Sequence, residues 1–406
     1  MKFLRNLLAI VVCISLTNCA TTGPGTGPIY NYGGEELVNS EVNIEPLSVS
    51  IAVFDPGLPE DPADYYSDTS WPELRRAESM HMAITLKETM EKTSNFGAVR
   101  VTPDAKSSSD LYVQAKIEES NGEDVSLKVT VSDSTGKKWI NKKVYSSRIT
   151  EYVFKEPRYR DKNGKLTVDP YDKIYERIAI DIAKLKISGD KAAKVRTVTK
   201  LRFAQNMSGE SFSDILKERN GIYTLTGLPD DDDPMMKRIE NIKYRDDMFI
   251  DSLQPHYESF GSDMSEPYSI WQQQAFVESK SAREQKAKAR GQALAGILVT
   301  ALAIYATGEA DTTAGAQTAA ILGSLGAIKL FSESFKSSQE AQVHRDALNE
   351  LGDSLDANLA PRVIEMEETT AELTGSAKEQ FQQWREILKK MYAQETETTA
   401  TIKIKT

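Results

Sequence analysis

The chain has 406 residues, with 50 basic and 60 acidic side chains and a formal net charge of −10. This acidic balance argues against a nucleic-acid-binding protein, which would carry a basic face. The length allows two or three domains. The two cysteines, Cys13 and Cys19, both lie near the N-terminus, so we expect neither a disulfide framework nor a cysteine-based metal site in the rest of the chain.

The N-terminus has the three-part layout of a secretory signal. Lys2 and Arg5 give a positive start, and an apolar run follows from Leu7 to Leu16. This run is too short for a membrane span. The segment ends at Cys19, and no good site for ordinary signal peptidase cleavage lies nearby. Residues 1–18 are therefore interpreted as a signal peptide.

The closing tetrad, LTNC, resembles the lipobox of bacterial lipoproteins, in which the cysteine is diacylated and becomes the new N-terminus. The resemblance implies that Cys19 carries the lipid. Ala20 stands where an Asp would direct retention in the inner membrane, which implies the outer membrane. The alternatives are a plain secreted protein and an uncleaved anchor. Residues 19–46 are rich in Gly, Thr and Pro and predict a flexible tether between lipid and body.

Residues 47–187 read as a two-layer α/β domain. A buried strand is predicted at 48–54, a helix at 71–93 and a second helix at 170–185. Strands with period-two alternation are predicted between the helices, at 99–101, 110–117, 125–131 and 139–145. Asn121-Gly122 and Thr135-Gly136 supply the turns of a meander. The expected order is β-α-β-β-β-β-α.

This order resembles the α/β domain shared by the curli-secretion lipoproteins, the penicillin-binding-protein activator lipoproteins and the N-terminal domain of the Tol translocation protein. The matching pieces are SIAVF, TLKETMEKTSNFGAVRV, SDLYVQAKIEE and VSLKVTVSDSTGKKWINKKV. The step at Ser94-Asn95-Phe96 and the hairpin at Asp133-Ser134-Thr135-Gly136 are also similar. The resemblance implies binding to other envelope proteins and no enzymatic role. Residues 149–169 are short and polar where the curli channel carries long amphipathic hairpins, so a β-barrel pore is not expected.

Residues 188–394 predict an all-α domain, and residues 395–406 predict a disordered tail. An apolar stripe along residues 239–260 is typical of a helix-bundle core. The predicted helices are 192–207, 212–219, 235–260, 266–307, 314–359 and 362–394.

Within this half, residues 287–331 form an apolar, glycine-zipper-like helical hairpin. Small residues recur every fourth position and would let two helices approach closely. One reading is a buried pair inside the bundle. The other is a hairpin that dips into the outer membrane or joins subunits, since runs of 15–18 apolar residues lie at the lower limit for a span. The candidate packing residues are Gly291, Ala295, Gly315, Ala319, Gly323 and Ala327.

No catalytic signature is present. The three histidines, His81, His256 and His344, lie in different predicted helices without metal-ligand spacing, and no cofactor or nucleotide motif occurs. The sequence therefore predicts a non-enzymatic outer-membrane lipoprotein on the periplasmic side, a structural or assembly component of an envelope complex. Its expected partners are the membrane, other envelope proteins and further copies of itself. The alternative is a subunit of an oligomeric export channel whose hairpins line or anchor the pore.

Overall fold

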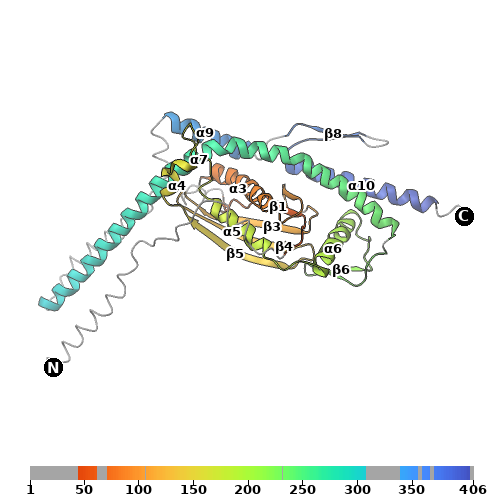
Figure 1. Cartoon of the computed structure of the whole chain (residues 1–406), viewed down its shortest axis with the longest axis horizontal. Coiled ribbons are helices and arrows are strands. Elements are labelled where there is room, and N and C mark those ends of the chain that lie inside the picture. The colour runs from red at the N-terminus through yellow and green to blue at the C-terminus, as the bar shows by residue number, and fades with distance from the viewer. Residues whose placement is uncertain are drawn as a thin grey trace, which may run out of the picture. The chain divides into compact units, whose positions relative to one another are not determined.

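The structure is a computed structural model that describes residues 44–61, 71–105, 107–230, 232–307, 339–354, 359–365 and 370–402. The described residues belong to one compact unit. It combines helices with a five-stranded mixed sheet, so the predicted mixture of α and β structure is confirmed (Figure 1). The elements up to residue 187 are β1 (Val49–Ala52), α3 (Pro72–Lys92), β2 (Val99–Thr102), β3 (Leu111–Ser120), β4 (Asp124–Asp133), β5 (Lys138–Arg148), α4 (Tyr152–Lys155), a 3-10 turn (Pro157–Tyr159) and α5 (Asp172–Ala183).

The sheet has the strand order β2-β1-β3-β4-β5. β1 pairs in parallel with both β2 and β3, whereas β3, β4 and β5 form an antiparallel meander. The predicted turns lie between these strands, with Gly122 and Gly136 at φ +84° and +82°. Glycine adopts this left-handed conformation at low cost, which explains the residue type at both turns.

One face of the sheet is apolar and is covered by α3 and α5 (Figure 1). The register aligns Val49 with Leu111 and Ile51 with Val113, and the alternating residues of β4 continue the same face. All four of these side chains are fully buried. Because successive strand residues point to opposite faces, Ser50 and Tyr112 lie on the other face, which carries the pocket described below.

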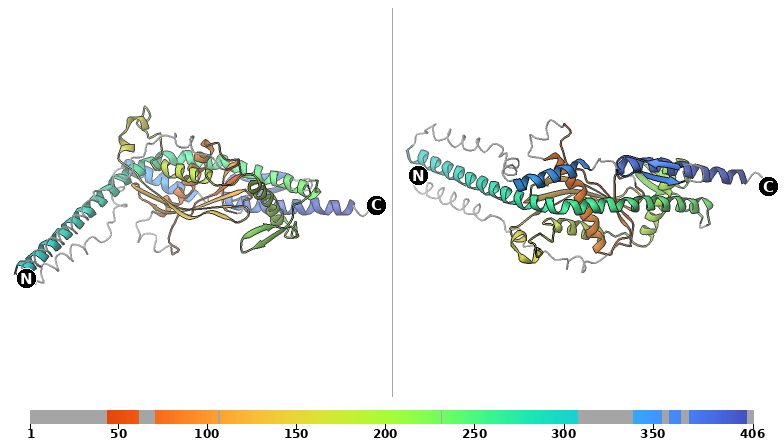
Figure 2. Two further views of the ribbon diagram at one scale, coloured as in Figure 1. Left: turned by 60° about the horizontal axis from the view of Figure 1, so that its bottom comes forward. Right: turned by 90° about the horizontal axis from the view of Figure 1, so that it is seen from above.

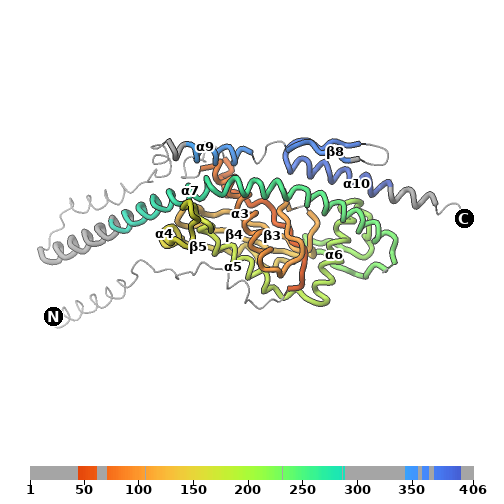
Figure 3. The backbone as a smooth tube through the Cα atoms, turned by 45° about the horizontal axis from the view of Figure 1, so that its top comes forward, coloured from red at the N-terminus to blue at the C-terminus, as the bar shows by residue number. Residues whose placement is uncertain are grey.

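The second half of the chain adds helices and two short hairpins. Figure 2 shows α7 as one continuous helix beside the sheet, and Figure 3 shows α9, β8 and α10 along it. The elements are α6 (Asp190–Met207), β6 (Leu216–Arg219), β7 (Ile222–Leu225), α7 (Pro234–Thr307), α9 (Gln339–Ser354), β8 (Arg362–Glu365), β9 (Thr370–Leu373) and α10 (Ala377–Ile402).

The prediction that residues 188–394 are all-α is wrong in two places. β6 and β7 form an antiparallel hairpin where a helix was expected at 212–219. Asn220 and Gly221 connect them with φ +53° and +76°, the two positive values of a type I′ turn, for which Asn-Gly is a strong signal. β8 and β9 form the second hairpin, in place of the start of the helix predicted at 362–394.

Three further boundaries differ from expectation. α7 continues through Pro255 and Pro267, where two helices were predicted. Each proline removes one intrahelical hydrogen bond, but α7 packs against α3, β2, α9 and α10, and these contacts support it on both sides. α10 continues to Ile402, beyond the predicted start of the tail at 395, because no Gly or Pro interrupts it. At the other end, buried Ile44 already pairs with Ile187, so the folded body begins inside the predicted tether.

The apolar stripe predicted for residues 239–260 is confirmed as core. Its members are buried in the contacts of α7: Ile239, Ile242, Phe249, Ile250, Leu253, Tyr257 and Phe260. Phe249 stacks on Trp384 of α10 with a centroid distance of 5.1 Å. Aromatic stacking and apolar burial therefore fix α10 on α7.

Candidate functional site

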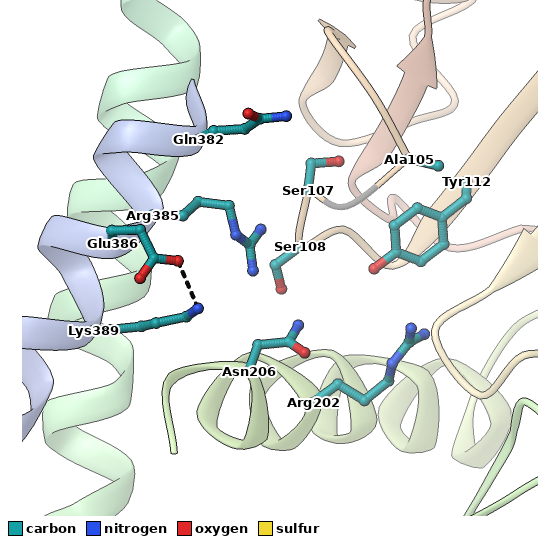
Figure 4. Close-up of a pocket in the computed structure, with 10 residues that line it drawn as sticks. All are labelled: Ala105, Ser107, Ser108, Tyr112, Arg202, Asn206, Gln382, Arg385, Glu386 and Lys389. Atoms are coloured by element: carbon teal, nitrogen blue, oxygen red, sulfur yellow. Dashed lines mark hydrogen bonds and ion pairs between the residues drawn. The ribbon is translucent and has the colours of Figure 1, made fainter. Parts of the chain in front are cut away.

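A polar pocket of about 380 Å³ lies where α6, α10 and the loop between β2 and β3 meet (Figure 4). Figure 4 shows side chains entering it from three directions: from α10, from α6, and from the loop together with Tyr112 of β3. The lining residues are Ala105, Ser107, Ser108, Tyr112, Arg202, Asn206, Gln382, Arg385, Glu386 and Lys389. Three of these side chains are cationic and one is a carboxylate.

The described residues of the loop between β2 and β3, 103–105 and 107–110, lie over the face of the sheet opposite α3. β2 and β3 are both parallel to β1, so the chain must return from the end of one strand to the start of the other. The Ser50 hydroxyl lies 2.6 Å from the Ser107 hydroxyl and 2.8 Å from that of Thr102, which holds the loop on the sheet. Ser107 and Ser108 are both buried.

α6 contributes Arg202 and Asn206. The Thr199 hydroxyl donates to Asp110 Oδ1 at 2.7 Å, and the Ser134 hydroxyl donates to the Val195 carbonyl at 2.7 Å, so α6 is fixed to both strands at the open end of the β3–β4 hairpin. Arg202 donates through Nη1 to the Ser134 carbonyl at 2.6 Å. Its guanidinium lies over Tyr223 at 4.2 Å and near Tyr112 at 5.8 Å from the ring centroids.

α10 contributes the other two cations. Lys389 forms an ion pair with Glu386 at 2.7 Å, and both side chains are largely exposed, at 42% and 67%. This contact lowers the pKa of Glu386. Arg385 is half-buried, and its guanidinium extends from α10 towards Ser108 (Figure 4).

Asp246 of α7 is a buried carboxylate that acts on Arg385. Burial raises the pKa of Asp246 to about 6, and the positive charge of Arg385 opposes that rise. The Trp384 indole donates to Asp246 Oδ1 at 3.2 Å. The charge of Arg385 is thus stabilised from inside the protein while its side chain lines the pocket.

The ionisable and hydroxyl groups of the pocket decide what it offers a ligand. The described lining residues include one carboxylate, and the Ser107 hydroxyl is engaged with Ser50. Burial raises the pKa of Tyr112, which keeps its hydroxyl protonated at neutral pH. The pocket therefore presents positive charge and neutral hydrogen-bonding groups.

A second polar cluster is buried where α3, α5 and α7 meet. Glu78 is fully buried, and its Oε1 accepts from the Ser120 hydroxyl at 2.5 Å and from the Tyr268 hydroxyl at 2.8 Å. Burial raises the pKa of Glu78, and the charge of Arg75 opposes that rise. The cluster connects residues 190 positions apart in the chain, and we interpret it as a hydrogen-bonded junction between elements.

His81 lies at the edge of this junction. Its Nε2 is 3.6 Å from Asp169 Oδ2, and its ring meets Tyr268 edge-on at 4.9 Å. The sequence placed His81 on a helix but gave no sign of its neighbours, because Asp169 and Tyr268 come from distant segments. Among the described residues, no group of His, Cys, Asp and Glu side chains has a metal-binding arrangement.

The sequence-predicted site residues are not brought together in the described part. Cys19 lies outside the described residues, as do Gly315, Ala319, Gly323 and Ala327. Gly291 and Ala295 belong to the helical backbone of α7. The pocket residues were not singled out from the sequence. The serine run at 107–109 and the cations of 385–390 are visible there, but their meeting depends on the fold.

Within the described residues, no helix combines the length and apolar character needed to cross a membrane. Comparison of the chain with models of protein families, with curated proteins and with solved structures finds no match.

Proposed function

We propose that the protein is a lipoprotein held by Cys19 in the outer membrane, on the periplasmic side, and that it acts without catalysis as an assembly component of an envelope complex. The observation that carries this proposal is the N-terminal segment, in which a positive start and an apolar run end at Leu16-Thr17-Asn18-Cys19. The resemblance of residues 47–187 to envelope-protein domains supports the same role.

We further propose that the α/β part, residues 47–187, and the part from 188 to 394 act as one body. The buried hydrogen bond from Tyr268 to Glu78 joins the two parts. The folded body begins no later than Ile44, so residues 20–43 would allow it to reach at most about 80 Å from the lipid. A partner within that distance of the membrane is accessible to the anchored protein.

The anchor is tested by Cys19→Ala in cells labelled with a radioactive fatty acid. The variant should lose the label and leave the membrane fraction. Cys13→Ala, in the same signal segment, is the matched control and should keep both. A Cys19→Ala variant that stays membrane-bound at an unchanged level would contradict lipid anchoring as the sole attachment.

The assembly role is tested by the mass of the complex extracted in mild detergent. An assembly component should co-purify with other envelope proteins in a complex larger than the 45.1 kDa chain. A ring made of this chain alone would favour an export channel, and a monomer without partners would contradict the assembly role.

A further inference from the structure

The pocket between α6, α10 and the loop from 103 to 110 concentrates positive charge in an acidic protein. The whole chain carries a formal charge of −10, whereas the described lining residues include three cations, Arg202, Arg385 and Lys389, and one acid, Glu386. When the buried Asp246 carboxylate near Arg385 is ionised and counted with them, three positive charges face two negative ones, a local balance of +1. A general attraction of anions to this chain is not expected from its net charge. The local excess therefore marks a specific place where an anion is stabilised.

The cations are held in position before any ligand arrives. Arg202 is fixed by its hydrogen bond to the Ser134 carbonyl at 2.6 Å and by its position over Tyr223. A guanidinium has five N–H donors, so this single bond leaves the fork able to engage oxyanions. The Arg385 guanidinium lies 5.7 Å from the centroid of the Phe381 ring on the same helix, and the buried carboxylate of Asp246 attracts its charge. Preorganised charges of this kind lose little entropy on binding.

Neutral donors complete the lining. The Tyr112 hydroxyl and the Asn206 amide face the same space as the two guanidinium groups (Figure 4). The Tyr112 oxygen accepts from the Ser109 N–H at 3.2 Å, which leaves its proton for a ligand, whereas the Ser108 hydroxyl already donates to the Thr199 carbonyl at 3.5 Å. An oxyanion with three terminal oxygens needs several donors from different directions, and this set provides them. A single carboxylate has two oxygens and one charge, which would leave part of this set unused.

The volume limits the size of the ligand. A cavity of about 380 Å³ lies at the small end of the range for small-molecule sites. It has room for a phosphorylated sugar or a group of similar size.

We propose that this pocket binds the dianionic phosphate of a phosphate monoester, with Arg202, Arg385 and Lys389 as its charged contacts. This function is separate from the lipid anchor and from the assembly role. The shared chemistry is the monoester group, whether it belongs to a soluble metabolite or to a lipid headgroup.

The test is calorimetric titration of the full-length lipidated protein in a non-ionic detergent with glucose 6-phosphate. Saturable binding with one site per chain is expected, with no binding of glucose. Arg385→Gln should weaken the affinity by roughly tenfold or more, as expected for loss of a charge-assisted contact. Lys390→Gln removes the same charge from an exposed position of α10 outside the lining, and its affinity should stay within about twofold of wild type.

A second variant keeps the test interpretable if Arg385→Gln does not fold. The Lys389 side chain is 42% exposed, so Lys389→Gln should fold, which circular dichroism checks, and it should also weaken binding. Because the second pKa of a phosphate monoester is about 6, affinity should fall between about pH 7.5 and 5.5. Asp246 titrates in the same window, with a pKa of about 6. The pH series is therefore repeated on Asp246→Asn, and the affinity must still fall if titration of the ligand phosphate is the cause.

Glucose 6-phosphate and glucuronate distinguish binding of a phosphate monoester from binding of a carboxylate. Vesicles distinguish a lipid headgroup from a soluble metabolite as the source of the monoester. Glucuronate carries a carboxylate on a similar sugar, and equal binding of glucuronate would overturn the proposal. Vesicles with phosphatidic acid present a monoester, and vesicles with phosphatidylglycerol present a diester. The vesicle measurements use the Cys19→Ala variant, because the lipid of the wild-type protein would insert into either vesicle. Preference for phosphatidic acid would support the lipid source, and binding of glucose 6-phosphate would support the soluble one. Equal binding of both vesicles without binding of glucose 6-phosphate, or no saturable binding of any probe, would overturn it.

Discussion

The side-chain amide of Gln254 on α7 pairs with both backbone polar groups of Val101 on β2. Its Oε1 accepts from the Val101 N–H at 3.0 Å, and its Nε2 donates to the Val101 carbonyl at 2.9 Å. β2 is an edge strand of the sheet, and an edge strand presents unpaired backbone groups. Gln254 thus supplies hydrogen-bond partners for the backbone groups of this edge strand at the point where α7 covers it.

The first prediction follows from this pair. Gln254→Leu should preserve the packing volume but leave the buried N–H and carbonyl of Val101 without partners. Each unsatisfied group costs about 1–3 kcal/mol, so the free energy of unfolding in urea should fall by about 2–6 kcal/mol. Gln273→Leu, at an exposed position of the same helix, should change it little. A Gln254→Leu variant as stable as that control would contradict the docking of α7 on β2.

The second prediction concerns Gly122 in the β3–β4 turn, which approaches α7 closely. A Cβ added there would lie 2.4 Å from the Ala275 Cβ and 2.7 Å from the Phe276 nitrogen. Gly122→Ala should therefore cost about 1–2 kcal/mol for its positive φ and a further 1–3 kcal/mol, roughly, for overpacking.

Gly164 is the matched control for this substitution. It has nearly the same φ, +83°, and a Cβ there would meet nothing within 4 Å. The difference between Gly164→Ala and Gly122→Ala in thermal or urea unfolding measures the contact of the turn with α7. Equal effects of the two substitutions would show that the turn and α7 do not touch.

The third prediction is a pH dependence from Asp246, whose folded-state pKa is about 6 against an ordinary value of 3.8. As the pH rises from about 4 to 6, the unfolded state releases this proton first, so the folded state loses stability over that window. Two pKa units correspond to about 3 kcal/mol. Asp246→Asn should flatten the pH profile of unfolding between pH 4 and 7 by up to that amount.

An exposed acid on the same helix provides the comparison for Asp246. Asp263→Asn removes a carboxylate at an exposed position of α7 and should leave the slope between pH 4 and 7 as in wild type. If Asp246→Asn leaves the slope unchanged as well, the Asp246 carboxyl is not buried against Trp384 as described.

The fourth prediction concerns the apolar segment from 287 to 331 and rests on the sequence. If the stripe through Gly323 packs against another helix, Gly323→Leu should destabilise the protein or its oligomer by about 1–3 kcal/mol through overpacking. The gain in helix propensity, about 1 kcal/mol, acts in the opposite direction. Ser324→Leu, about 100° around the helix, is the control. A Gly323→Leu variant that is as stable as wild type or more stable would contradict the packing of this stripe against another helix.

The sequence by itself determined the local elements of residues 47–187 and the candidate anchor. Alternation in β3 and β4 and the turn glycines at 122 and 136 are local signals, so the meander could be predicted from them. The apolar stripe of α7 was predicted in the same way, because a periodicity of 3.6 residues depends on neighbouring positions alone. The Asn220-Gly221 turn is an equally local signal for the β6–β7 hairpin, and the chain forms this hairpin in place of the helix predicted at 212–219.

Only the tertiary structure decided which side chains meet. Arg202 and Arg385 are separated by 183 positions, and Tyr268 and Glu78 by 190, so no spacing along the chain relates them. Their meeting depends on the crossing of the loop over the sheet, on the docking of α6 through Thr199 and on the packing of α10 through Trp384. These are packing solutions among distant segments, and packing is set by the complementarity of whole surfaces rather than by local pattern.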